Sequence, residues 1–374
     1  MDPIALLTAF AAALGVITTD AVLHSDTVNI HIAVPADLAK TLPKDEVLEE
    51  IYIADMEKIV ETKNYFGTPE IKSSHAKTIG SVLAKALKVE DFAAAIQHQF
   101  GMKVASVNAS LAVDNGKQQF VAVVSDIDEP PFILIINREN NDSLRDVLLK
   151  AAVNTMEHLS PYLTAVYYIN DSDKSGDYQK ADQLLAGMLV QYASSAYKKE
   201  RAGTLNLAGI VALHKNDIEG SEKLFEAAND ADPDLIIPQI NRAFVMLLTD
   251  RDQQALEVLT PALEALKSKR DATLLAAAEM TRAAAYIALN RLDYAEISLN
   301  NAAYWDPTSA LVPGLAAGLE HLKGNDAQAA VLRRKATDNL DNFETYPELA
   351  SLYFKLSWKK GEPLIKNDVK ATLH

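Results

Sequence analysis

The chain has 374 residues, of which 49% are hydrophobic and 23% are charged, and this length and composition predict a soluble protein of two or three domains. An excess of 51 acidic over 36 basic residues gives a net charge of −15, which argues against nucleic acid or an anionic membrane surface as the main partner. The absence of cysteine excludes disulfides, thiolate metal sites and a cysteine nucleophile.

Residues 1–26 are predicted to form a hydrophobic helix, and no charged residue occurs between positions 4 and 19. Asp20 interrupts the run before the ~20 apolar residues that a spanning helix needs, and no Lys or Arg precedes it as in a secretory signal. Three interpretations stay open: a short or tilted membrane anchor, a helix buried in a partner, and a helix buried in the protein's own core. The apolar residues of this membrane or assembly helix are Ile4, Leu6, Leu7, Phe10, Leu14 and Ile17.

Residues 27–160 are predicted to form a small α/β domain. In its first half, alternating or helical apolar spacing predicts a strand at 27–34, a helix at 44–62, a short edge strand at 68–72, and helices at 74–87 and 89–100.

The second half of this domain carries the clearest strand pattern. Residues 102–113 and 117–125 are joined by Asn115-Gly116, a dipeptide typical of a two-residue hairpin turn. Residues 132–137 (FILIIN) predict a further, largely buried strand, and Asp142 or Ser143 caps a helix that runs to about Leu159. The sequence therefore predicts a mixed or antiparallel sheet of about four strands.

From residue 161 to 374 the strand patterns vanish and a helix-pair repeat is visible. Pro233 and Pro307 close two of the copies, and start points near 202, 236, 276 and 310 are separated by 34, 40 and 34 residues. A weaker copy at 174–181 precedes them. The second helix of each copy carries a small, a large and again a small residue: Ser221, Phe225 and Ala228; Ala255, Leu259 and Ala262; Ala295, Leu299 and Ala302.

This pattern resembles the tetratricopeptide repeat (TPR), a 34-residue helix pair in which small residues let helices approach closely. The resemblance covers about 180 residues and implies, for the whole chain, an α+β fold that ends in an all-α, TPR-like solenoid. Two arginines, Arg242 and Arg282, stand where the family usually has an apolar residue, and the middle copy has six extra residues near 267–272. Paired internal charges, altered helix packing and a binding position are all compatible with these arginines.

The resemblance also implies a partner-binding groove on the first helices of the repeats, and this row is largely apolar. An amphipathic helix or an apolar segment is therefore the expected ligand, although the chain's own segment 346–358 is an equally suitable occupant. The residues carried over are Asn206, Ile210, Leu213 and His214; Ile240, Phe244, Leu247 and Leu248; Met280, Ala284 and Ile287; Gly314, Gly318 and His321.

No motif for catalysis, metal or cofactor stands out. Neither GxGxxG nor GxxxxGK[ST] occurs, and the histidines show no HxH or HxxxH spacing. Ser74 and Lys77 are more typical of a helix cap than of an acyl enzyme, and the acidic residues at 126–129 are more typical of a solvated loop than of a metal site. We therefore expect no metal, no cofactor and no enzyme activity.

The order of a hydrophobic helix, an α/β domain and repeats also resembles that of bacterial membrane-anchored TPR proteins. It predicts a non-catalytic scaffold with a soluble body, associated with a membrane through residues 4–19 and facing the cytoplasm or the periplasm. The partner is a protein of unknown identity or a second copy of the chain, and not nucleic acid. Two alternatives are a homo-oligomeric assembly protein and an enzyme whose active site lies in the α/β domain.

Overall fold

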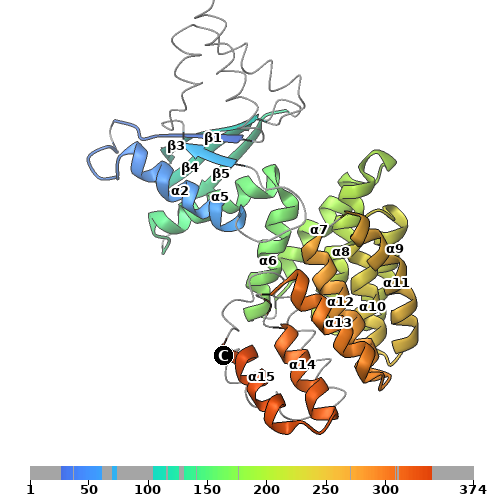
Figure 1. The fold of residues 1–374 in the computed structure, drawn as a ribbon. Coiled ribbons are helices and arrows are strands. Elements are labelled where there is room, and N and C mark those ends of the chain that lie inside the picture. The colour runs from blue at the N-terminus through green and yellow to red at the C-terminus, as the bar shows by residue number, and fades with distance from the viewer. Residues whose placement is uncertain are drawn as a thin grey trace, which may run out of the picture. The chain divides into compact units, whose positions relative to one another are not determined.

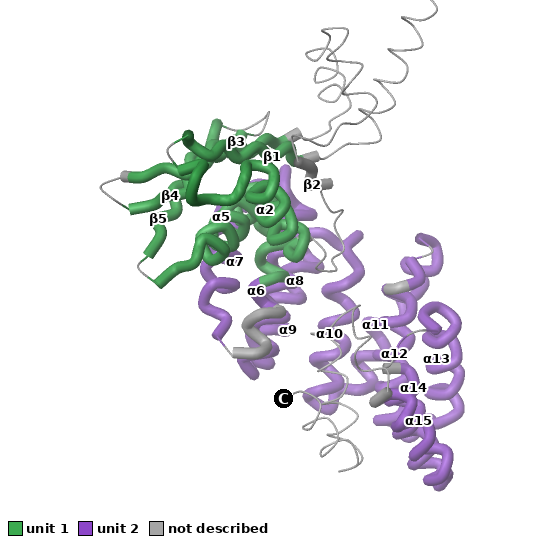
Figure 2. Tube along the Cα trace, turned by 90° about the vertical axis from the view of Figure 1, so that its left-hand side faces the viewer, with its two compact units in different colours: residues 1–167 green, residues 168–374 purple. Residues whose placement is uncertain are grey.

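The computed structural model describes residues 27–60, 70–73 and 104–338, apart from 37, 115–116, 126–129, 140, 176, 270, 308 and 310. These residues fall into two compact units that divide between Tyr167 and Tyr168 (Figure 2). Several predicted features lie outside the described residues: the helix in 1–26, the helices at 74–87 and 89–100 with Ser74 and Lys77, the Asn115-Gly116 turn, the acidic residues at 126–129, and the segment 346–358.

The first unit contains a five-stranded sheet in the order β2-β1-β3-β4-β5 (Figure 1). Strand β1 runs parallel to both β2 and β3, whereas β3, β4 and β5 are antiparallel neighbours, so the sheet is mixed. The strands are β1 (Thr27–Ala33), β2 (Glu70–Ser73), β3 (Val104–Asp114), β4 (Lys117–Ser125) and β5 (Phe132–Asn137).

The predicted α+β class and the mixed sheet are confirmed, with one strand more than the expected four. The short edge strand expected at 68–72 is β2, which lies at the edge of the sheet and pairs with β1 from Thr27 opposite Glu70 onward. The predicted hairpin is also present, since Asp114 of β3 lies opposite Lys117 of β4 with two residues between them.

Helices α2 (Asp45–Val60) and α5 (Leu144–Leu159) pack together on one face of the sheet. The alternating residues of the strands that face them are fully buried, among them Ile30 and Phe120. Tyr52 of α2 stacks on Phe120 at 5.4 Å between ring centroids and shares a 2.5 Å hydrogen bond with Thr155 of α5. This polar contact satisfies the one hydroxyl that the tyrosine carries into the apolar core.

The rest of the described chain is helical (Figure 1). Its elements are α6 (Pro161–Ser175), α7 (Gln179–Gln191), the 3₁₀ turn η1 (Ser195–Tyr197), α8 (Lys198–His214), α9 (Ile218–Ala231), α10 (Ile237–Leu248), α11 (Asp252–Lys269), α12 (Ala272–Ala288), α13 (Leu292–Trp305), α14 (Leu311–Leu322) and α15 (Asp326–Asp338).

The turns between paired helices repeat at the interval predicted from the sequence. The positive-φ residues are Asn216 (63°), Asp250 (61°), Asn290 (55°) and Gly324 (81°), and they are spaced by 34, 40 and 34 positions. After each of them, the next N–H donates to a carbonyl five residues earlier, as in Asp217 to Ala212 at 2.8 Å. This bond ends a helix with a left-handed residue, a conformation that Gly, Asn and Asp tolerate best. The predicted array of TPR-like helix pairs is thus confirmed.

The six extra residues of the middle copy lengthen its second helix. Helix α11 has 18 residues, whereas its counterparts α9 and α13 have 14 each. The insertion therefore adds about one helical turn without changing the turn that precedes α11.

Close packing within each pair explains the small residues of the repeat. A Cβ atom on Gly209 of α8 would lie only 2.5 Å from a ring carbon of Phe225 in α9. In the next two copies the position of Gly209 is taken by Ala243 and Ala283, and these copies have leucine where the first has phenylalanine. The largest second-helix side chain is therefore accommodated by the smallest first-helix residue.

Candidate protein-binding surfaces

Most of the predicted groove residues are buried in the helical array. Asn206 accepts a 2.9 Å hydrogen bond from the side-chain amide of Asn241, which links the first helices of two consecutive copies. The buried members are Asn206, Ile210, Leu213, Ile240, Phe244, Leu247, Met280 and Gly314; the half-buried ones are His214, Leu248, Ala284, Ile287, Gly318 and His321.

Two half-buried histidines of this row, which lie at helix ends, have neighbours within the array. The ring of His214 lies 5.6 Å from that of Tyr178, and Nδ1 of His321 lies 2.6 Å from a carboxylate oxygen of Asp326. Both contacts join the end of a first helix to a neighbouring helix. These histidines therefore have a structural role in addition to the predicted place on the groove.

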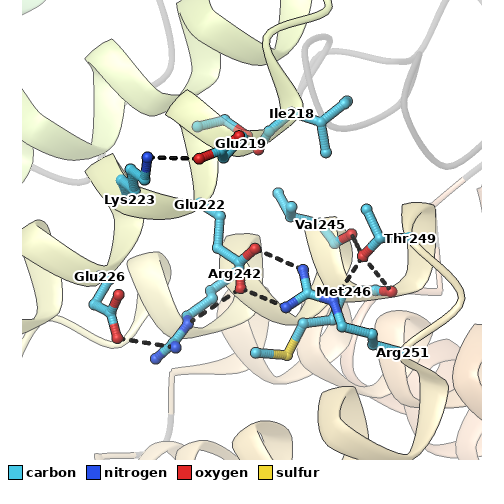
Figure 3. Close-up of polar contacts among 11 residues, drawn as sticks. Ile218, Glu219, Glu222, Lys223, Glu226, Arg242, Val245, Met246, Thr249 and Arg251 are labelled. Carbon is cyan, nitrogen blue, oxygen red and sulfur yellow. Dashed lines mark hydrogen bonds and ion pairs between the residues drawn. The ribbon is translucent and has the colours of Figure 1, made fainter.

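Arg242 belongs to an ion-pair cluster between α9 and α10 (Figure 3). Its Nη2 lies 3.0 Å from Oε1 of Glu226 and its Nε lies 3.9 Å from Oε1 of Glu222. Arg251 holds Glu222 with both terminal nitrogens, at 2.9 and 2.5 Å. The hydrogen bond from Arg251 lowers the pKa of Glu222, so this carboxylate stays ionised when the solution becomes mildly acidic.

Arg282 occupies the same repeat position as Arg242 but has buried partners. Its Nη2 lies 2.5 Å from Oε2 of Glu279, and its Nε donates a 3.1 Å hydrogen bond to Ser298 of α13. Glu279 is only 2% exposed, and this burial raises its pKa while Arg282 opposes the shift. Of the three interpretations of the arginines, paired internal charges describes Arg282, whereas Arg242 is paired with carboxylates that keep access to water.

Helix α13 carries an exposed apolar row that we name the α13 stripe, formed by Tyr294, Ile297 and Tyr304. Their exposed fractions are 59%, 55% and 76%. The spacing of three and seven residues places them on one side of the helix. Tyr294 packs against Tyr286 at 5.3 Å between ring centroids, and Tyr304 meets the edge of Trp305 at 5.0 Å. These ring contacts favour a fixed orientation for the two tyrosines.

The same positions in the second helices α9 and α11 carry glycine or polar residues. When the buried small residues of the repeat are aligned, Ile297 corresponds to Lys223 in α9 and to Glu257 in α11, both of which are exposed. Only Val331 of α15 is another exposed apolar residue at this position among the described repeats. The full comparison sets Tyr294, Ile297 and Tyr304 against Gly220, Lys223 and Asp230 in α9 and Gln254, Glu257 and Glu264 in α11. The stripe is therefore a property of one copy and not of the repeat.

Sequence reasoning missed the α13 stripe because it followed the first helices, where the family binds its ligands. The signal was nonetheless present: the small residues Ala295 and Ala302 define the buried side of α13, and the residues beside them point outward. A comparison of outward positions between copies would have revealed the two tyrosines and the isoleucine.

Within the described ranges, no group of three or more histidine and acidic side chains is placed to hold a metal ion. Among the helices built from those same residues, none has both the length and the apolar content to cross a bilayer.

No protein-family model matches the chain, and no curated protein is detectably similar to it in sequence. Solved structures that resemble this chain include "MamA MSR-1 C2", with 19% identity, a TM-score of 0.33, and coverage of 48% of this chain and 97% of that one. "MamA 41-end from Desulfovibrio magneticus RS-1" has 19% identity and a TM-score of 0.33, with coverage of 48% of this chain and 96% of that one. "MamA RS-1 ArsTM double mutant" has 17% identity and a TM-score of 0.34, with coverage of 49% of this chain and 96% of that one. At these TM-scores the likeness supports no inference about function, and the repeat is established by this chain's own geometry.

Proposed function

We propose that this protein is a non-catalytic scaffold whose helical array holds a protein partner, with the α13 stripe as the docking surface for an amphipathic helix. The observation that carries the proposal is the exposure of two tyrosines and an isoleucine at positions that carry no apolar side chain in α9 and α11. Exposed apolar patches on soluble domains mark interaction sites, and tyrosine is among the residues that contribute most to such sites.

The geometry of the stripe favours a helix as ligand. Apolar residues that recur after three and seven positions form a seam that matches the apolar side of another helix. One flank of the seam carries the exposed carboxylates of Asp293 and Glu296, of which Glu296 forms a 2.5 Å ion pair with Lys323 of α14. A partner helix with an apolar side and a Lys or Arg placed beside Asp293 therefore fits both the shape and the charge of this surface.

The first-helix row is a second proposed contact for the same class of ligand. Its half-buried members, such as Leu248 and Ile287, would contribute to the contact, whereas Phe244 is fully buried and serves the packing of the array. A test of this row therefore uses Leu248→Asp and Ile287→Asp, because Phe244→Asp would unfold the helix pair.

We also propose that residues 4–19 associate the protein with a membrane. The uncharged apolar run supports this proposal. Removal of residues 1–26 is expected to transfer the protein from the membrane fraction to the soluble fraction of its source cells. Retention in the membrane fraction after this deletion would contradict an anchoring role.

The experiment that tests the stripe replaces it with the residues that α11 carries at the same positions, in the variant Tyr294→Gln, Ile297→Glu, Tyr304→Glu. Capture from source cells with the wild-type chain supplies the partner, and the affinities of purified proteins are then compared. Loss of three apolar contacts should weaken binding by about a hundredfold. The matched control is Val190→Gln, which changes an exposed apolar residue of α7 and should bind as the wild type does. An unchanged affinity in the triple variant would refute the proposal.

A further inference from the structure

Strand β5 is the last strand of the sheet and has a free edge. Its neighbour β4 lies on one side, and none of the described strands lies on the other. The edge backbone can be assigned because the N–H of Arg138 donates to the carbonyl of Gln118 at 2.9 Å. In an antiparallel ladder such pairs recur at every second residue. Phe132, Leu134 and Ile136 therefore direct their N–H and C=O groups at β4.

The remaining residues of the strand direct their backbone groups away from the sheet. Ile133 and Ile135 thus present N–H and C=O groups at the free edge, and their side chains are 63% and 54% exposed. The strand FILIIN contains neither a charged residue nor a proline, which are the usual means by which an edge avoids pairing with another chain. Both the backbone and the side chains of β5 are therefore available for another strand.

The apolar character extends from the edge into the sheet. Val123 lies opposite Ile133 and Val121 lies opposite Ile135, so β-branched residues of two strands share the face that α2 and α5 do not cover. The opposite face of β5 packs against the helices, since the Phe132 ring stacks on His158 of α5 at 4.6 Å between centroids and Leu134 is buried. The open face and the free edge therefore meet along β5.

The sequence of β5 matches a second copy of itself. If two copies pair antiparallel about Leu134, Ile133 of one lies opposite Ile135 of the other, and Phe132 lies opposite Ile136. Ile133 and Ile135 are also the residues whose backbone groups are free, so they would exchange N–H···O bonds across the axis. A pairing centred on Ile135 would instead set Ile133 opposite the polar Asn137. The register about Leu134 therefore pairs the free backbone groups of Ile133 and Ile135 and also sets apolar side chains opposite one another.

We propose that β5 pairs antiparallel with β5 of a second copy, which joins two five-stranded sheets into one continuous sheet across a two-fold axis. A two-fold interface requires a surface that is complementary to itself, and the register about Leu134 meets this requirement. The valine and isoleucine pairs of the two copies then form one continuous apolar surface. This interface belongs to the first unit and is independent of the α13 stripe.

Cysteine cross-linking tests the register directly, because the natural chain has no cysteine. In the variant Ile133→Cys, Ile135→Cys, each new thiol faces its counterpart in the other copy. Mild oxidation of the full-length protein should therefore give a covalent dimer. Either single variant should give far less, since two copies of the same position lie diagonally, beyond the roughly 7 Å between Cα atoms that a disulfide spans. Equal cross-linking in single and double variants, or none in the double variant, would overturn the proposal.

A charge on the edge provides the second measurement. Ile135→Lys places an ammonium group on the exposed face, so the sheet should fold as in the wild type, as an unchanged far-UV circular dichroism spectrum would show. Sedimentation velocity should then give a dimer for the wild type and for the exposed-site control Val190→Lys, and a monomer for Ile135→Lys. A monomeric wild type, or a dimer that persists in Ile135→Lys, contradicts pairing through β5. Partner binding through α13 should be the same in both lysine variants, which separates this proposal from the proposed function.

Discussion

Helices α9 and α13 are the second helices of two copies of the same repeat, yet they present different surfaces. Both have 14 residues, both follow a left-handed turn residue, and both bury their small, large and small residues at the same positions. Their outward positions differ, with Lys223 and Asp230 on α9 and Ile297 and Tyr304 on α13. The inward residues therefore maintain the fold, and the differences between outward residues indicate where a copy has acquired a function of its own.

The ion pairs of Arg242 and Arg282 also differ between copies, although the two arginines occupy the same repeat position. Arg242 joins α9 to α10 through carboxylates that keep access to water, and Glu222 keeps Arg251 as a second partner (Figure 3). Arg282 instead neutralises Glu279, a carboxylate that is almost completely buried. One repeat position thus holds a surface ion pair in one copy and an internal ion pair in another.

The largest difference between the copies should follow from removing these arginines. Arg282→Met leaves the buried Glu279 carboxylate without its cationic partner, with the 3.3 Å hydrogen bond from Asn301 remaining, and should lower the free energy of unfolding by about 3 kcal/mol. Arg242→Met should cost no more than about 1 kcal/mol, because its partners are solvated. Urea unfolding of both variants at pH 7 measures the two values, and equal costs would contradict the distinction.

The cost of Arg282→Met should also depend on pH. Burial already raises the pKa of Glu279 above its ordinary 4.5, and loss of Arg282 raises it further. A carboxyl group with a raised folded-state pKa favours folding when it is protonated, and this contribution is lost as the pH rises. The deficit of the variant should therefore shrink when unfolding is measured near pH 4.5 instead of pH 7. A deficit that does not depend on pH would show that Glu279 is not the group left unpaired.

The next effect concerns Gly209, where the first copy differs from the third. Gly209→Ala sets a methyl group against the Phe225 ring and should destabilise by about 1–2 kcal/mol. The same substitution should cost less in a Phe225→Leu background, which reproduces the alanine and leucine of the third copy. Gly187→Ala is the control, because a Cβ atom there meets no atom within 4 Å and alanine favours a helix. If Phe225→Leu does not reduce the cost, the two residues are not coupled.

The smallest effect on stability is expected at Glu222, in helix α9 of the first copy. Its pKa is lowered by the hydrogen bond from Arg251, so its contribution to stability is present above the ordinary value of 4.5 and is lost as the pH falls. Glu222→Gln should therefore reduce stability by up to about 1 kcal/mol at pH 7 and by less in acid. Unfolding curves at several pH values measure this difference, and a larger cost in acid would contradict the assignment.

The helix pairs and the hairpin could be predicted because local residue types determine them. Asn and Asp at the repeat turns, small residues between helices, and Asn-Gly between two alternating runs each favour one backbone conformation. The short edge strand was expected at 68–72 and lies at Glu70–Ser73, because four residues carry too little periodic signal to fix its bounds. Whether an apolar first-helix residue such as Phe244 lies in a groove or between helices also depends on tertiary packing, which the repeat pattern alone does not contain.

Photo-cross-linking on equivalent positions of three copies tests the central claim most directly. A benzophenone amino acid replaces Ile297 on α13, Lys223 on α9 or Glu257 on α11 in the full-length protein, which is irradiated in its source cells. We predict one discrete cross-linked protein from position 297 and none from positions 223 and 257. The same product from all three positions, or none from position 297, would contradict a docking surface on α13.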